Sequence, residues 1–328
     1  MYHQLEPGWH GLCEDARMEP LPALPCLALF RSHREYRDAR SWLARYWERD
    51  RLLRARLFGK KSIEGLCALC RKRCEFSLPA EEGADALRES LHCRGCGLNN
   101  RLRAAIALWL AYGGPKAHAR IYLSEQTTPL YAWLKCRFPD AIGSEYLGAE
   151  RMPGECVPDP ALGALRHEDL TRLSFASESI EHLLCFDVLE HLPQHLPALR
   201  EFARVLVPGG VLVLSAPFDC EREDHEERAR VAEDGRIEHL LPPIYHGDPL
   251  SPERGILCYR TYGWKLLEEL REHGFSESVL ALVWSPGHGH LGWPNLVLLA
   301  RRDGSPALEQ PSIGEIPGEH EMPAPLIA

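Results

Sequence analysis

Long hydrophobic runs are missing from this sequence. No stretch of eighteen consecutive apolar residues occurs, so no transmembrane helix is expected. The first twenty residues have neither a basic start nor a long apolar segment, which argues against a secretion signal. No internal repeat is visible either. We therefore expect a cytoplasmic protein without a membrane span.

A net positive charge is also absent. Lys and Arg number 38 against 47 Asp and Glu, and the net charge of −9 argues against a protein coated with nucleic acid. Residues 31–61 are an exception, with eleven basic and four acidic side chains. Such a block can contact phosphate or an acidic partner, although a solvated helix face is the commoner meaning.

The 328 residues suffice for one large α/β domain and a smaller module.

Cysteine, in contrast, is abundant and clustered. Five of the twelve cysteines fall within residues 67–96. In a cytoplasmic protein such clusters indicate metal or redox chemistry rather than disulfides. Cys67 and Cys70 form one Cys-x-x-Cys pair, Cys93 and Cys96 form another, and twenty-two residues lie between the two pairs. The spacing predicts a tetrahedral zinc site that is structural, because four protein ligands leave no position for water.

Other interpretations of the cysteine segment stay open. Cys74 and His92 are spare donors that could replace a ligand. A redox role is possible, but the strand-to-helix context of a thioredoxin-type motif is absent. The basic residues around the cysteines could hold phosphate, or the segment could be a scaffold that docks substrate or caps a sheet edge. Those basic residues are Arg71, Lys72, Arg73, Arg94, Arg101 and Arg103.

The chain divides into five predicted segments. Residues 1–32 are rich in proline and lack periodicity, which predicts a disordered arm, and 303–328 predict a disordered tail. Residues 33–62 predict a basic amphipathic helix. The predicted zinc-binding module covers 63–98, and 99–302 form the main domain.

The helix predicted within 33–62 has one apolar stripe. Leu43, Tyr46, Leu53 and Leu57 recur at helical spacing, and arginines fill most other positions. The helix should pack on the main domain through its aromatic residues, Trp42, Tyr46 and Trp47.

The main domain shows an α/β pattern. From residue 119 short apolar runs alternate with helical segments, which predicts a mostly parallel sheet with helices on both faces. Helices are expected near 130–138, 196–206 and 263–273, and a polar insertion at 219–262 is a plausible substrate-side lid. The expected strands are 121–123, 141–147, a short one before Glu168, 180–186, 211–216, 278–284 and 295–301.

Three consecutive segments resemble a known family. They are Asp169-Leu-Thr-Arg-Leu-Ser-Phe175, the strand that ends in Asp187-Val-Leu-Glu-His191, and a helix that leads through Pro208-Gly-Gly210 into a buried strand. In this order they resemble the C-terminal half of class I S-adenosylmethionine-dependent methyltransferases. The resemblance implies a Rossmann-like seven-stranded sheet, S-adenosylmethionine as cofactor, and methyl transfer to an acceptor that the sequence does not identify.

The resemblance also implies which residues bind the cofactor. Glu145, which follows the second strand, matches the acidic residue that binds the ribose hydroxyls; a solvated loop carboxylate is the alternative. Asp169 and Leu170 match the pair that flanks the adenine. Asp187 lies in the segment that passes beneath the methionine part and the methyl group.

One family feature is missing. Family members follow the first strand with a glycine-rich loop, whereas residues 123–129 here contain no glycine. Glu125 and Gln126 could bind the methionine end of the cofactor instead. Otherwise the pocket is degenerate, and the chain is a non-catalytic, zinc-containing module that binds nucleic acid or protein.

Two histidines are candidates on the acceptor side. His191 ends the motif after the fourth strand, and His246 lies in the insertion. An imidazole titrates near neutral pH and can accept a proton, although a structural role is at least as common. A small-molecule or glycan acceptor is expected in preference to a macromolecule, and nucleic acid remains possible.

Overall fold

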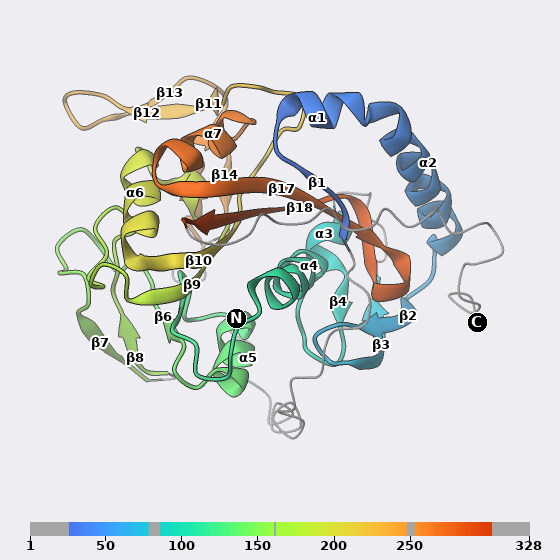
Figure 1. Ribbon diagram of the computed structural model, residues 1–328, viewed down its shortest axis with the longest axis horizontal. Coiled ribbons are helices and arrows are strands. Elements are labelled where there is room, and N and C mark those ends of the chain that lie inside the picture. Colours follow the sequence, from blue (N-terminus) through green and yellow to red (C-terminus); the bar gives the residue numbers. More distant parts are fainter. Residues whose placement is uncertain (1–25, 79–85, 161, 248–252, 304–328) are drawn as a thin grey trace.

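A seven-stranded sheet forms the centre of the molecule (Figure 1). The computed structural model describes residues 26–78, 86–160, 162–247 and 253–303. The strand order is β1-β17-β18-β10-β9-β5-β6. The four neighbouring strands β10, β9, β5 and β6 are parallel to one another. β18 is antiparallel to both its neighbours, and β1 is antiparallel to β17. Their bounds are β1 Cys26–Phe30, β5 Ile121–Leu123, β6 Ile142–Gly143, β9 Ile180–Phe186, β10 Leu206–Ser215, β17 Phe275–Ser285 and β18 His290–Arg302.

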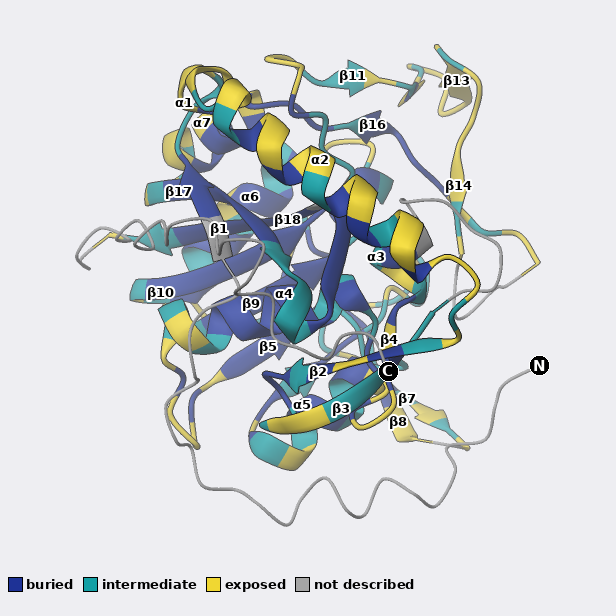
Figure 2. Cartoon of the chain, turned by 90° about the vertical axis from the view of Figure 1, so that its right-hand side faces the viewer, coloured by how far each residue is buried: buried dark blue, intermediate teal, exposed yellow. Residues whose placement is uncertain are grey.

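Helices cover both faces of this sheet, as predicted. Successive side chains of a strand point to opposite faces, so Val211 and Val213 of β10 enter one core while Leu212 and Leu214 enter the other. Burial on both sides explains why the central strands are continuous apolar runs (Figure 2). The helices are α4 Asn100–Leu108, continued by η2 Trp109–Gly113, and α5 Pro129–Arg137 on one side, with α6 Leu196–Val205 and α7 Lys265–Glu272 on the other.

The predicted helix at 33–62 is two helices. α1 (His33–Asp38) and α2 (Arg40–Leu57) meet at Ala39. The predicted apolar stripe of α2 is buried, whereas Trp47, which was also expected to pack on the domain, is 50% exposed. Figure 2 shows α2 as a ribbon of alternating buried and exposed turns on the surface.

A buried carboxylate docks α2 onto the sheet. Asp50 is inaccessible to solvent and accepts hydrogen bonds from Trp284 Nε1 and from the backbone N–H of Gly292, both at 3.0 Å. Arg54, one turn further along, donates to its other oxygen at 2.6 Å. The polar groups that this contact buries are therefore paired.

The prediction of a disordered arm over residues 1–32 is wrong near its end, where the chain forms a strand at one edge of the sheet. Residues 26–30 form β1 and pair with β17, and Leu29 and Phe30 are buried. The strand covers an edge of the sheet that would otherwise present unpaired backbone groups. Residues 1–25 and 304–328, which hold the rest of the predicted arm and nearly all of the predicted tail, lie outside the described residues.

The third predicted strand also differs from expectation. β8 (Gly163–Arg166) pairs with β7 (Cys156–Asp159) as a separate hairpin, and one bridge, between Glu145 and His167, links this region to the sheet. The side chain of Gln126 occupies the backbone groups that a sheet partner would use. Its amide donates to Ala164 O and accepts from Arg166 N, each at 2.9 Å.

Two smaller regions complete the fold. The cysteine module consists of β2 Ser62–Cys67, β3 Lys72–Ser77, α3 Ala86–Ser90 and β4 His92–Cys93. The insertion forms three two-stranded ladders, β11 (Glu226–Glu227) with β16 (Arg260–Thr261), β12 (Ala229–Val231) with β13 (Ile237–His239), and β14 (Tyr245–His246) with β15 (Ile256–Leu257). Short helical turns are η3 Leu189–His191 and η4 Pro286–His288. Among the described helices, none has the length and apolar character to cross a membrane.

Candidate functional site

Three acidic residues come together where parallel strands end. Glu125 follows β5, Glu145 follows β6, and Asp187 follows β9. The carboxyl ends of parallel strands lie at one edge of a sheet, which is where open α/β folds bind ligands. The charges of Glu145 and Asp187 both act on Glu125, so the structure brings these sequence-predicted residues into one site.

Glu145 orders the glycine-free loop after β5. Its Oε1 accepts hydrogen bonds from the backbone N–H of Gln126 at 2.7 Å, from the N–H of Thr127 at 2.8 Å, and from the Thr127 hydroxyl at 2.8 Å. Thr128 then caps α5 by accepting from Tyr131 N at 3.3 Å. A carboxylate on the neighbouring strand thus fixes a loop that in the resembling family depends on glycines.

A glycine does permit a close approach to the loop after β5, but this glycine lies in β6, the strand next to β5. A Cβ added to Gly143 of β6 would lie 2.7 Å from the carbonyl oxygen of Glu125 and 2.6 Å from Tyr131 Cε2. Real Cβ atoms do not come this close to backbone. The absence of glycine from residues 123–129 is therefore matched by a glycine at 143.

Glu125 and Gln126 have different surroundings. Glu125 Oε1 is shielded from solvent and has no hydrogen-bond partner among the described residues. Burial raises the pKa of Glu125 to about 7, against the opposing charge of Arg101. The amide of Gln126, in contrast, is held by the backbone of β8. Of these two residues, Glu125 therefore offers an uncommitted side-chain oxygen to a ligand and Gln126 does not.

Arg101 is a site residue that sequence reasoning missed. It projects from the start of α4, forms an ion pair with Asp187, and donates to Glu89 at 2.8 Å. Burial acts to raise the pKa of Asp187, but Arg101, Arg88 and His246 outweigh it, so the pKa lies below its usual value. The sequence placed Arg101 only in the basic flank of the cysteine module, because nothing local connects it to Asp187.

The adenine-side candidates form a loop beside β8. Asp169 Oδ1 accepts from the Thr171 backbone N–H at 2.9 Å and from its hydroxyl at 2.7 Å, and Leu170 is buried. Tyr146, immediately after Glu145, is 58% exposed, and the charge of Asp169 contributes to its raised pKa after the larger effect of burial. An exposed aromatic ring thus lies within electrostatic reach of Asp169.

The two predicted acceptor-side histidines also come together. His191 and His246 have ring centroids 5.1 Å apart and perpendicular planes. The buried thiol of Cys258 joins them, and one potential ligand atom from each of the three residues lies within 4.8 Å of the others. Contacts with Cys258 and Glu190 raise the pKa of His246 to about 10.

The four predicted zinc ligands form a compact cluster. Cys67 and Cys96 have sulfurs 3.9 Å apart, and those of Cys70 and Cys93 are 3.8 Å apart. All four ligand atoms lie within 4.8 Å of one another.

The two cysteine turns share one geometry. Arg71 N donates to Cys67 O and Gly97 N to Cys93 O, each at 2.8 Å, and both donors have positive φ, of 55° and 71°. Of the spare donors, Cys74 lies close to this group, since a Cβ on Gly95 would be 3.1 Å from its sulfur. His92 is exposed, and its Nδ1 contacts Ser90 O at 2.9 Å.

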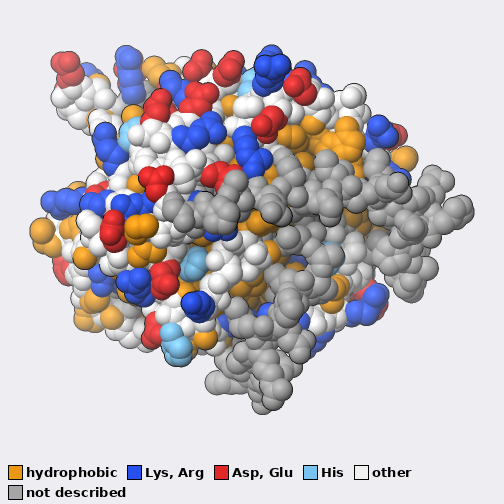
Figure 3. Space-filling view, in the orientation of Figure 1, with side chains coloured by type: hydrophobic (Ala, Val, Ile, Leu, Met, Phe, Trp, Pro, Cys, Tyr) orange, Lys and Arg blue, Asp and Glu red, His pale blue; other side chains and the backbone are white. Residues whose placement is uncertain are grey.

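The basic residues that flank the cysteines have different surroundings. Arg103 is buried over the ring of Phe76 and donates to three backbone carbonyls. Arg94 pairs with Glu75 at 2.9 Å. Together with the inward position of Arg101, these contacts engage three of the six flanking basic residues, whereas Lys72 and Arg73 are exposed. Figure 3 shows basic and acidic side chains interspersed over the upper part of one face.

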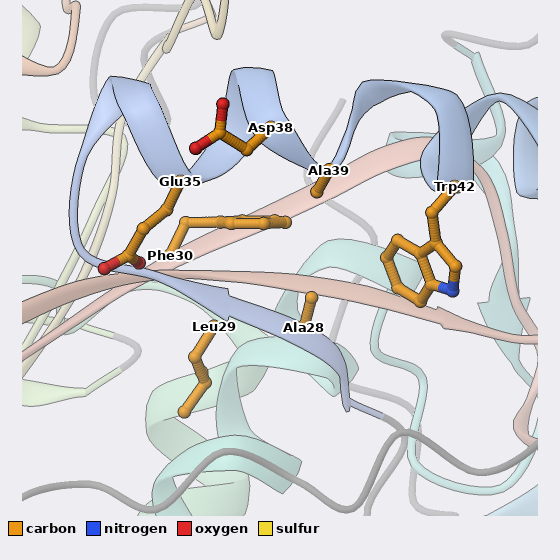
Figure 4. A pocket seen from close by; sticks show the side chains of 7 residues that line it. All are labelled: Ala28, Leu29, Phe30, Glu35, Asp38, Ala39 and Trp42. Atoms are coloured by element: carbon orange, nitrogen blue, oxygen red, sulfur yellow. The ribbon is translucent and has the colours of Figure 1, made fainter.

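A surface groove lies at the opposite edge of the sheet. It runs between β1 and the α1–α2 corner, and its lining is mostly apolar (Figure 4). The groove is remote from Glu145 in the strand order, because β1 and β6 are the two edges of the sheet. Its lining residues are Ala28, Leu29, Phe30, Glu35, Asp38, Ala39 and Trp42.

Comparison with known proteins finds similarity to methyltransferases over part of the chain. Residues 147–214 match the family described as methyltransferase domain. An uncharacterised methyltransferase of Mycobacterium leprae is 35% identical over 113 residues, which cover 33% of this chain and 41% of the relative. A counterpart from Mycobacterium avium is also 35% identical over 113 residues, or 44% of its length. The chain thus spans less than half the length of the curated relatives it matches.

Solved structures are similar only in a loose sense. An S-adenosylmethionine-dependent methyltransferase from Mesorhizobium loti is 16% identical with a TM-score of 0.37, covering 62% of this chain and 100% of that chain. No residue role is transferred at this level. The family match therefore shows that residues 147–214 are similar to a methyltransferase domain.

Proposed function

We propose that the protein transfers a methyl group from S-adenosylmethionine to an acceptor. The observation that carries the proposal is the convergence of Glu125, Glu145 and Asp187 at the ends of three parallel strands, within a domain whose residues 147–214 match methyltransferases. The cofactor fits this site by charge. Its ammonium and sulfonium groups are cationic, the site is rich in carboxylates, and Arg101 could meet the cofactor's own carboxylate.

Each cofactor residue has a role in this proposal. Glu145, with Oε1 committed to the loop, presents Oε2 to the ribose hydroxyls. Asp169 and Leu170 bind the adenine, and exposed Tyr146 offers a ring for it to stack on. Glu125 pairs with the methionine ammonium.

The methionine end also depends on backbone support. Gln126, whose amide holds β8, contributes by fixing the loop beneath the methionine part. Asp187 lines the floor. S-adenosylmethionine supplies the activated methyl group when bound, and the protein residues position it.

The cysteine cluster is proposed to bind structural zinc. A tetrahedral ion with Zn–S bonds of about 2.3 Å requires sulfurs about 3.8 Å apart, and two of the sulfur pairs lie at 3.8 and 3.9 Å. The four thiolates Cys67, Cys70, Cys93 and Cys96 would fill the coordination sphere. Zinc would then stiffen the module from which α4 and Arg101 extend.

The acceptor side is proposed at His191 and His246, in reach of the insertion. An imidazole there would bind the acceptor or take its proton. A small molecule or glycan is favoured over a nucleic acid, because the arginines of the module are largely turned inward or paired. A cytoplasmic location is proposed with it.

Isothermal titration of the full chain with S-adenosylhomocysteine tests the proposal. We expect binding in the micromolar range, at least tenfold weaker in Glu145→Gln and unchanged in Glu150→Gln, an exposed carboxylate on the same loop. The absence of any binding would reject the enzyme. Salt-dependent RNA binding by the same preparation would then favour the alternative, a non-catalytic nucleic-acid or protein-binding module.

A further inference from the structure

We propose that Glu190, His191, His246 and Cys258 form a second metal site, which binds Zn²⁺ beside the cofactor edge of the sheet. This inference goes beyond methyl transfer and beyond the four-cysteine cluster. Metal binding at this site does not depend on the proposed function.

The ligand atoms converge from three separate segments. Glu190 and His191 belong to η3 after β9, His246 ends β14, and Cys258 follows β15. The β14–β15 ladder pairs His246 with Ile256 and so fixes the spacing of the last two ligands. Backbone hydrogen bonds add to this order: Tyr259 N donates to Glu190 O at 2.8 Å, and Cys258 N donates to Ile244 O at 2.9 Å.

The donor types match zinc. One thiolate, two imidazoles and a carboxylate are ligands of Zn²⁺, which accepts sulfur, nitrogen and oxygen in tetrahedral sites. His191 Nδ1 contacts Leu257 O at 2.9 Å, and a carbonyl can only accept, so Nδ1 carries the proton. The Nε2 lone pair of His191 is then free, and Nε2 lies 3.8 Å from Glu190 Oε1. Metal-bound histidines characteristically donate their other ring N–H in this way.

Glu190 supplies the independent observation. Its side chain is inaccessible to solvent, and neither carboxylate oxygen has a hydrogen-bond partner of good geometry among the described residues. Its Oε1 lies 3.2 Å from His246 Nδ1, so the carboxylate faces the histidines. A buried carboxylate that has imidazoles nearby but no well-formed hydrogen bond is unfavourable, and a bound cation removes that cost.

A second cluster with metal-ligand side chains, His195, His225 and Glu269, differs in that hydrogen bonds within the protein already satisfy its carboxylate. Glu269 Oε2 lies 2.7 Å from His195 Nε2 and 3.0 Å from His225 Nε2. His225 Nδ1 accepts from Gly263 N at 3.2 Å, so its Nε2 can donate to the carboxylate. Hydrogen bonds therefore satisfy Glu269, whereas Glu190 lies close to His246 and His191 without forming a hydrogen bond of good geometry.

The cluster is open to solvent on one side. The side chain of His246 is 36% exposed, against 9% for His191 and 0% for Glu190, so an ion can enter past His246. With zinc bound, His191 and His246 would act on the acceptor through the cation that they hold, and direct proton transfer to an imidazole would be confined to the zinc-free protein. This last point rests on the proposed function.

Metal analysis of the full chain, purified without chelators, tests the site. We expect two zinc ions per chain by mass spectrometry, falling to one in His246→Gln and in Cys258→Ser. Cys70→Ser should lose the other zinc and keep this one. His239→Gln, an exposed histidine of the same insertion, is the matched control and should retain both.

Three outcomes would overturn the site: one zinc per chain in the wild type, wild-type zinc content in both cluster variants, or no zinc at all. Circular dichroism identifies a variant that fails to fold, and exposed His246 is the position more tolerant of change. S-adenosylhomocysteine titration of the same samples separates the two proposals, because zinc without cofactor binding rejects the methyltransferase alone.

Discussion

Glu125 couples cofactor binding to pH. Its pKa is raised to about 7 by burial, and it is proposed to pair with the ammonium of the cofactor. Only the ionised carboxylate can form that pair, so affinity should increase as pH rises through the pKa. We expect about tenfold tighter binding of S-adenosylhomocysteine at pH 8 than at pH 6, measured by titration calorimetry.

The variant Glu125→Gln should bind more weakly and lose most of this pH dependence. Glu150→Gln, which changes an exposed carboxylate nearby, should keep it. An equal slope in wild type and Glu125→Gln would show that another group titrates.

His182 makes folding stability depend on pH in a different range. The side chain is buried against Trp109, its Nδ1 has no hydrogen-bond partner among the residues described, and burial lowers its pKa to about 4. The unfolded chain, with a pKa near 6.5, binds the proton more readily. The free energy of unfolding therefore has its full value above pH 6.5. It falls as pH decreases toward 4, by up to about 3 kcal/mol at about 1.4 kcal/mol per pH unit.

Urea unfolding at pH 7.5, 6 and 5 would measure this effect. His182→Gln should show a smaller loss of free energy of unfolding between these values, whereas His118→Gln, at an exposed position, should behave as wild type. Parallel pH curves for all three proteins would contradict the assignment.

At the scale of elements, β6 and the loop after β5 depend on each other. Gly143→Ala would place a Cβ against the Glu125 carbonyl and the Tyr131 ring. One of them must move, so we expect a loss of about 1–3 kcal/mol in stability together with weaker S-adenosylhomocysteine binding. Gly247→Ala, where a Cβ meets no atom within 4 Å, is the control. Wild-type affinity in Gly143→Ala would show that the loop tolerates displacement.

Strands and helices with strong local patterns could be predicted from sequence. β9 spans the predicted 180–186, and α6 covers most of the predicted 196–206, because apolar periodicity there reflects burial directly. The strand at 26–30 could not be predicted, since its five residues are ordered by pairing with β17, far along the chain. Local pattern carries no information about such a partner.

The residues of the candidate site likewise fall into those that could be predicted from the sequence and those that could not. Glu145 and Asp187 could be found because each follows a recognisable strand. Arg101 could not, because its role depends on how the cysteine module is placed against the sheet. Gln126 was assigned to the cofactor from its position in the loop, while its actual contacts to β8 depend on a hairpin that the sequence placed inside the sheet.

At the scale of the whole molecule, the cysteine module should control cofactor affinity from a distance. Arg88 reaches Asp187 from α3 within the module, and Arg101 reaches it from α4, the helix that follows the module. Cys70→Ser should remove the zinc of the cysteine module, loosen these helices and weaken S-adenosylhomocysteine binding by about tenfold, the effect of losing one charge-assisted contact.

The matched control is Cys136→Ser, which changes an exposed cysteine on α5. Both proteins would be compared by calorimetry and metal analysis. Unchanged affinity in a zinc-depleted Cys70→Ser protein would show that the module and the site are independent.

The pairing of β1 with β17 has a consequence for how the chain folds during synthesis. Residues 26–30 leave the ribosome early, yet their partner at 275–285 follows almost the whole domain. Trp284 and Gly292, the hydrogen-bond donors to Asp50 of α2, are likewise synthesised long after Asp50 itself. The cysteine module is local in sequence and can form while the first strand and helices remain without their partners. Release of the C-terminal hairpin would therefore set the moment at which the N-terminal segment docks, and until then that segment is exposed to chaperones and proteases.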